Sequence, residues 1–287
     1  MTRFTIAVVL PGLALIALGC DMNKVDPGGG VSSDSVVTVR SGSAAAPTAG
    51  GDTDGGGGDA AASSGGGAPG KLVGTIKFSG TAPVLAPKAT KGNAKDPAVC
   101  AKDADIPDES LVVGADGGLQ HVFIYLDKAP DGGTAETPTI DVFDQKACLF
   151  TSHSFLAVAG VEFEVKNSDA AAHNVHTFPQ LGAVQNFGME PNSATTMSFN
   201  KAERAPIQIK CDIHPWMEGW ALILDHPYMA KTDANGNFEL PELPGGTYNV
   251  RIWHERGAKN GQLERAKVTI NGETRLDREF PAGDFKL

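Results

Sequence analysis

Short strand-like segments, the clearest with alternating apolar and polar residues, recur along the chain and limit the folds open to it. At 161–165 the apolar residues Val161, Phe163 and Val165 alternate with two glutamates. Strict alternation over roughly four to eight residues predicts a strand with one buried face. Other short runs rich in apolar and strand-forming residues lie at 72–78, 120–126, 154–160, 195–199, 205–210 and 220–224. Their spacing predicts an all-β fold with a Greek-key sandwich, in which the runs 154–160 and 161–165 pair with each other across a glycine.

Residues 1–20 predict export. Arg3 precedes an apolar run at 4–18 that is too short for a membrane-spanning helix and is typical of a signal peptide. The segment 17–20, Ala-Leu-Gly-Cys, resembles the lipobox of bacterial lipoproteins. This resemblance implies a lipid on Cys20 that holds the protein on the periplasmic face of a bacterial membrane. Plain secretion and an uncleaved anchor are the alternatives.

Residues 21–70 are expected to be a flexible tether. They are mainly Gly, Ala, Ser, Thr, Asp and Pro, and offer almost no apolar surface to bury. As a coil, about fifty residues reach roughly 40 Å, which frees the folded part from the membrane surface. The full chain has a net charge of −10. This acidic balance argues against nucleic acid as a partner and leaves basic proteins open.

Two sulfurs and two imidazoles predict a copper site. The four residues are His173, Cys211, His214 and Met217. Ile207 and Ile209 share the parity of Cys211, so a strand at 205–210 directs the sulfur into the core. Copper sites of the electron-transfer type use two His, one Cys and a weak axial Met. Zinc also accepts Cys and His, but Met is a poor zinc ligand.

At these positions the chain resembles the cupredoxins, the small blue copper proteins of the amicyanin and plastocyanin type. Their His-Asn pair corresponds to His173-Asn174, and their Cys-x-x-His loop ending in Met corresponds to 211–217. The resemblance implies a cupredoxin domain at 139–226 that holds one copper ion per chain. It places the thiolate and both imidazoles in a trigonal plane, with Met217 on the axis.

The neighbours of the ligands have expected roles as well. Asn174 is expected to tie the two ligand loops together by hydrogen bonds. Trp216 is expected to shield the metal, with core filling or docking as alternatives, and His176 is an alternative ligand. The chain departs from the family at Lys210, where an aromatic residue is common, and at Asp212, where a small neutral residue is common. Both departures bear on redox potential and spectral type.

The C-terminal part resembles a second family, the carboxypeptidase regulatory-like (transthyretin-like) sandwich. The similar segments are 232–240 and 243–250, with the family's first strands at 74–76 and 121–126. This implies an Ig-type sandwich split into 71–138 and 227–287, with the cupredoxin inserted in it or packed on it. The combination of both modules also resembles bacterial lipoproteins labelled methylamine-utilisation-like. The resemblance implies a fold and no activity.

The remaining cysteines predict a disulfide. With Cys20 assigned to lipid and Cys211 to metal, Cys100 and Cys148 are left. In an oxidising compartment they are expected to form a disulfide that fastens the irregular stretch 82–111. Two free buried thiols are the alternative.

The function predicted from these features is one-electron transfer with a redox partner protein. No small-molecule substrate and no enzymatic activity are implied. A copper lipoprotein for storage, delivery or sensing is one alternative, and a structural module with a vestigial site is another. A copper oxidase is a further alternative that needs a second copper, for which His121, His153 and His254 are candidates if they gather in space.

Overall fold

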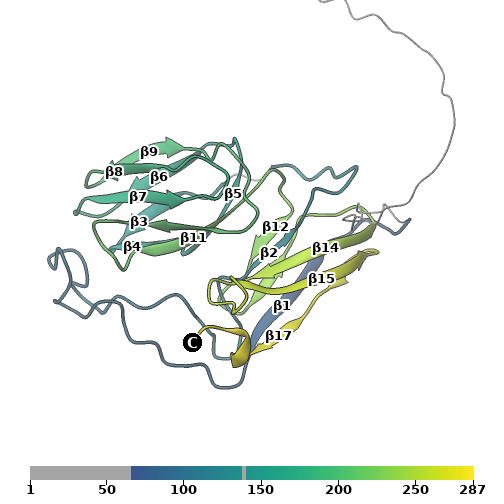
Figure 1. Ribbon diagram of the computed structural model, residues 1–287, viewed down its shortest axis with the longest axis horizontal. Coiled ribbons are helices and arrows are strands. Elements are labelled where there is room, and N and C mark those ends of the chain that lie inside the picture. The colour runs from purple at the N-terminus through teal and green to yellow at the C-terminus, as the bar shows by residue number, and fades with distance from the viewer. Residues whose placement is uncertain (1–65, 138–139) are drawn as a thin grey trace, which may run out of the picture. The chain divides into compact units, whose positions relative to one another are not determined.

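The computed structural model describes residues 66–137 and 140–287, and within them the regular structure is β-strand apart from one short 3-10 helix, η1 (Ala282–Asp284). No helix among these residues is long and apolar enough to cross a bilayer. The expected signal peptide, Cys20 and most of the expected tether lie outside the described residues. The all-β prediction is therefore confirmed for the described part of the chain (Figure 1).

One sandwich combines strands from both ends of the described chain. Its first sheet has the order β13 (Asn237–Glu239), β1 (Leu72–Ser79), β16 (Thr274–Arg275), with β17 (Arg278–Pro281) also pairing with β1. Its second sheet has the order β12 (Met229–Lys231), β2 (Phe123–Leu126), β14 (Gly246–Trp253), β15 (Gln262–Ile270). Both sheets contribute to one apolar core, for example through Ile76 of β1 and Val250 of β14.

A second sandwich uses the strands between β2 and β12. One sheet has the order β5 (Ser154–Val158), β11 (Glu218–Leu224), β10 (Ile207–Lys210), β7 (His173–Phe178), β8 (Asn186–Met189). The other has the order β4 (Leu149–Phe150), β3 (Phe143–Lys146), β6 (Phe163–Asn167), β9 (Ser193–Met197). Their shared core contains five phenylalanines, at 143, 150, 155, 163 and 199, together with Cys211 and Met217. Two of the candidate metal ligands, Cys211 and Met217, therefore lie in this apolar core.

The sequence prediction that 154–160 and 161–165 pair with each other is wrong. β5 pairs with β11, whereas β6 pairs with β3 and β9 in the opposite sheet. Gly160 adopts φ +81°, and the N–H of Val161 donates to the carbonyl of Val158. This tight turn carries the chain from one sheet to the other, because glycine enters the left-handed region without the cost of a Cβ clash.

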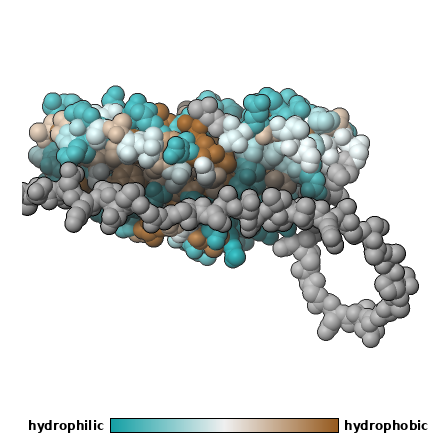
Figure 2. Space-filling model, turned by 90° about the horizontal axis from the view of Figure 1, so that it is seen from above, coloured by the Kyte–Doolittle hydropathy of each residue, from teal (hydrophilic) through white to brown (hydrophobic). Residues whose placement is uncertain are grey.

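Strand β2 is buried on both faces. Ile124 and Leu126 pack into the core of the first sandwich, whereas Phe123 and Tyr125 join Leu222 of β11 in a separate cluster. The double burial explains why 122–126 is continuously apolar and does not alternate. This cluster packs the two sandwiches against each other. Figure 2 shows a face that is mainly hydrophilic, with apolar atoms gathered near its middle.

Candidate metal centre

Three strands bring the candidate ligands together. His173 is the first residue of β7, and Cys211 directly follows β10. His214 and Met217 lie in the turn from β10 to β11, and β10 pairs with both β7 and β11. Along β10, Ile207 and Ile209 are buried, and Cys211 continues the same parity with 2% exposure. The sequence-based argument from parity therefore places the sulfur correctly.

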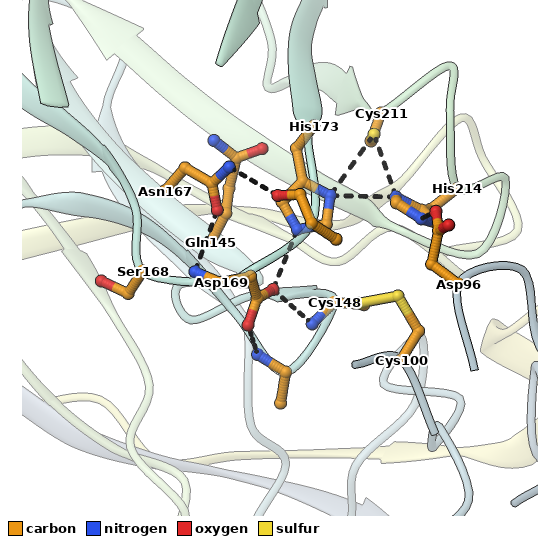
Figure 3. Close-up of polar contacts among 12 residues, drawn as sticks. Asp96, Cys100, Gln145, Cys148, Asn167, Ser168, Asp169, His173, Cys211 and His214 are labelled. Carbon is orange, nitrogen blue, oxygen red and sulfur yellow. Dashed lines mark hydrogen bonds and ion pairs between the residues drawn. A yellow bond between two sulfur atoms is a disulfide. The ribbon is translucent and has the colours of Figure 1, made fainter. Parts of the chain in front are cut away.

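The donor atoms of His173, Cys211 and His214 face one another in the core. The Nδ1 atoms of His173 and His214 are 2.9 Å apart, and the Cys211 sulfur lies 4.0 Å from the first and 3.8 Å from the second. All three side chains are at most 2% exposed. Figure 3 shows the two rings turned toward the sulfur. Two nitrogens and one sulfur thus converge in a buried space, with donor types and separations that can hold a metal ion.

Two carboxylates hold the outer nitrogens of the histidines. The Nε2 of His173 lies 2.9 Å from Asp169, and the Nε2 of His214 lies 2.9 Å from Asp96. Because Nε2–H donates to a carboxylate in each case, the Nδ1 lone pair is free for a metal. Asp169 also accepts the backbone N–H of Ala147 and of Cys148, which fixes its position.

These contacts change the proton affinities of the centre. Burial lowers the pKa of His173, but its hydrogen bonds to Asp169 and Cys211 outweigh burial and raise that pKa to about 9. Burial raises the pKa of Cys211, but both histidines and the N–H of Asn174 lower it to about 6. At neutral pH the metal-free centre therefore holds a thiolate beside an imidazolium. A metal held by the Nδ1 of His173 would displace that proton, since a ligating imidazole is neutral.

Asn174 links the two ligand-bearing segments. Its backbone N–H lies 3.5 Å from the Cys211 sulfur. Its side chain accepts the N–H of Asp212 at 2.7 Å and donates to the carboxylate of Asp212 at 2.9 Å. That carboxylate also pairs with His176 at 3.0 Å. His176 is thus engaged at the rim through Nδ1, and the structure does not bring it into the donor set.

Met217 and Trp216 close the loop around the centre. Met217 is fully buried in the same core as Cys211, and its carbonyl accepts the Cys211 N–H at 3.0 Å. The Trp216 ring lies 5.2 Å from the His214 ring, and its Nε1 donates to the carbonyl of Cys148. The indole therefore packs beside the His214 ring, and a role in shielding a metal stays a prediction.

The predicted disulfide between Cys100 and Cys148 is present. Both cysteines are fully buried, and the bridge fastens the irregular stretch 82–111 beside the centre. The Asp96 contact depends on this stretch. Sequence reasoning missed Asp96, because 118 residues separate it from His214 and no local pattern marks it. Asp169 lies only four residues before His173, yet the sequence alone did not single it out.

The three histidines considered for a second copper gather at a different place. The rings of His121 and His153 are 4.9 Å apart, with His254 nearby. Each has a hydrogen-bond partner on at least one nitrogen: Ser154 contacts His121, Glu255 pairs with His153, and the N–H of Arg256 donates to Nδ1 of His254, whose Nε2 is buried without a partner. Among the described residues, the donor groups that lie within 4.8 Å of one another do not include this trio. We therefore interpret it as a polar network between the sandwiches.

Comparisons with known proteins give structural similarity only. No family model and no curated protein match the chain. A reduced amicyanin mutant aligns with a TM-score of 0.26 and 19% identity, over 35% of this chain and 97% of its own. A copper-containing nitrite reductase from Thermus scotoductus SA-01 aligns with a TM-score of 0.26 and 17% identity, over 32% of this chain and 24% of its own. A purple cupredoxin from Nitrosopumilus maritimus aligns with a TM-score of 0.24 and 16% identity, over 29% of this chain and 95% of its own.

The donor set itself fits copper. Two imidazole nitrogens and a thiolate lie together, and both outer nitrogens are already paired. Soft sulfur with imidazole suits copper, and the carboxylates on both Nε2 atoms leave the Nδ1 side of each ring facing the sulfur. Lys210 and Asp212, the two residues that differ from the cupredoxin pattern, have partners outside the group of donor atoms. Lys210 pairs with Glu218, and the Asp212 carboxylate is engaged by Asn174 and His176.

Proposed function

We propose that this chain is a type 1-like copper protein that transfers single electrons to and from a partner protein. The observation that supports this most is the buried group of His173, Cys211 and His214, whose donor atoms all lie within 4.8 Å of one another. In the proposal the group holds one copper ion, with Met217 as the weak axial ligand.

The residues around the ligands keep the centre rigid. Copper bound here supplies a one-electron redox couple, since Cu(I) and Cu(II) interconvert. Asn174, Asp96 and Asp169 each restrain a ligand through hydrogen bonds of the chain itself. Because the ligands sit in a packed core, they move little when the charge of the centre changes. A small rearrangement between oxidation states is what an electron carrier needs.

Export and anchoring are part of the same proposal. The segment 17–20 and the tether at 21–70 support a lipoprotein that presents its folded part on the periplasmic side of a membrane. The cupredoxin domain is assigned to 139–226, and a split regulatory-like sandwich to 71–138 and 227–287. In this arrangement the regulatory-like sandwich orients the copper domain.

The deciding experiment is a visible absorption titration of the purified protein with Cu(II), beside a Cys211→Ser control. We expect an intense thiolate-to-copper band that saturates at one copper per chain and is absent from the control. A well-folded protein that stays colourless, or a band unchanged by the substitution, would contradict the proposal. In the first case a structural module with a vestigial site becomes the better explanation.

Copper storage or delivery is a second candidate function. It is favoured by one observation: the sulfurs of Cys100 and Cys148 lie within 4.8 Å of a His214 nitrogen, so more sulfur surrounds the centre than electron transfer requires. The rate at which a strong chelator removes copper separates the two functions. An electron carrier keeps its copper through many redox cycles, whereas a delivery protein releases it.

A further inference from the structure

The disulfide lies directly against the copper-ligand candidates. The sulfurs of Cys100 and Cys148 and a ring nitrogen of His214 all lie within 4.8 Å of one another, and all three side chains are 0% exposed. Figure 3 shows the bridge next to the His214 ring, on the side away from Cys211. His214 therefore belongs to two donor groups, one with Cys211 and one with the two bridged cysteines.

Hydrogen bonds connect each half of the disulfide to one ligand. The N–H of Cys100 donates to the carbonyl of Asp96, whose carboxylate holds His214. The N–H of Cys148 donates to Asp169, which holds His173. The backbone around the bridge thus positions both histidines, and both cysteines stay anchored by backbone contacts that do not depend on the S–S bond.

The backbone at this bridge is unusual. Four of the seven described non-glycine residues with positive φ are at or next to the bridge segments: Asp96, Ala101, Ala147 and Cys148. Such conformations are disfavoured for residues with a Cβ and concentrate at functional sites. Most of the residues around Cys100, from 86 to 105, are exposed and carry only isolated bridge pairings. The stretch that covers the bridge is therefore held by few regular backbone hydrogen bonds, and access of a reductant to the bridge requires this stretch to open.

We propose that reduction of the Cys100–Cys148 disulfide creates a second copper site, in which both thiolates and His214 bind Cu(I). A dithiol reductant supplies two electrons and two protons, the S–S bond breaks, two thiols form, and the reductant becomes a disulfide. Cu(I) then displaces the thiol protons. Thiolate ligands select Cu(I), and the pair is already close enough to be bridged.

Because His214 belongs to both donor groups, the second site competes with the first for this residue. Cu(I) held by the reduced cysteines uses a ring nitrogen of His214, whose Nδ1 faces Cys211 and whose Nε2 is held by Asp96, so it competes with one of these contacts. The thiol–disulfide state therefore selects between copper retained for electron transfer and copper held by thiolates. The inference goes beyond the proposed function, and it does not require that the Cys211 centre transfers electrons.

The test measures Cu(I) affinity in a Cys211→Ala variant of the full protein. Competition against a chromogenic Cu(I) chelator is carried out without oxygen, before and after reduction with a phosphine that is then removed. We expect reduction to tighten Cu(I) binding at least 100-fold. The matched control is the Cys211→Ala/Cys100→Ala/Cys148→Ala variant, in which reduction changes nothing. Equal affinity of the oxidised and reduced Cys211→Ala protein would overturn the proposal.

Two further variants keep the result interpretable. The Cys100→Ala/Cys148→Ala protein retains Cys211, so its Cu(II) titration and circular dichroism report whether the fold survives without the bridge. If it does not fold, His214→Asn in the Cys211→Ala background replaces the control, because it keeps both cysteines. We expect the increase in Cu(I) affinity on reduction to be at least tenfold smaller in that variant. An undiminished gain would show that His214 is not a ligand of the reduced site, which refutes the shared site.

Discussion

Replacing Asp96 by Asn is expected to raise the reduction potential of the copper-loaded protein. Asp96 accepts a hydrogen bond from His214 Nε2 at 2.9 Å, and its side chain is 48% exposed. Asn keeps an acceptor oxygen and tolerates the φ of +53° at this position. The substitution therefore removes one negative charge with little change of shape. A negative charge near the metal stabilises the more positive oxidation state, Cu(II).

The size of the effect follows from the distance between the carboxylate and the metal. Adding about 2 Å for the metal–nitrogen bond and about 2 Å across the ring to the hydrogen bond gives a separation of about 7 Å. At that distance one unit charge contributes about 0.6 kcal/mol in water and about 2.4 kcal/mol at an effective dielectric constant near 20. For a one-electron couple this is about 25–100 mV. Because Asp96 is half-exposed, we expect a value in the lower half of that range.

The assay is a potentiometric or voltammetric titration of both proteins at low and moderate salt. Asp103→Asn is the matched control, since Asp103 is an exposed carboxylate on the same stretch and removes the same net charge. We expect a rise for Asp96→Asn that exceeds the control and shrinks with added salt. Equal shifts in both variants, or a lower potential for Asp96→Asn, would refute the assignment of Asp96 as a partner of His214.

Two further predictions concern the metal-free protein. The disulfide spans 48 residues, so the Cys100→Ala/Cys148→Ala variant is expected to lose about 4 kcal/mol of unfolding free energy, measured by urea denaturation. A loss below about 1 kcal/mol would show that other contacts hold the stretch 82–111. The thiolate absorbance of Cys211 is expected to appear with a midpoint near pH 6, absent from Cys211→Ser, because its pKa is lowered to about 6. Since that pKa lies below the unfolded value of 9.0, the thiolate's contribution to stability is complete above pH 9 and is lost as the pH falls toward 6. His173 acts in the opposite direction, because its raised pKa stabilises the fold below pH 6.5 and this is lost as the pH rises through about 9. A thiolate midpoint near 9 would contradict the ion-pair description.

The local parts of the site were readable from the sequence. The parity of Ile207, Ile209 and Cys211 fixes the direction of the sulfur, because successive side chains of a strand point to opposite faces. The spacing of His214 from Cys211 fits one tight turn, closed by the Met217 N–H donating to the His214 carbonyl. Alternation and turn residues were also enough to predict the all-β class. All of these are properties of neighbouring residues, which a single sequence records.

The surroundings of the candidate ligands could not be predicted from the sequence. Asp96 meets His214 across 118 residues, and His153 meets Glu255 across 102. Strands β5 and β6 are adjacent in sequence but lie in different sheets. The disulfide could be paired from the sequence by counting cysteines, but its place beside His214 could not. Such contacts depend on how separate sheets pack and how a long irregular segment is closed on them, and local periodicity carries no record of either.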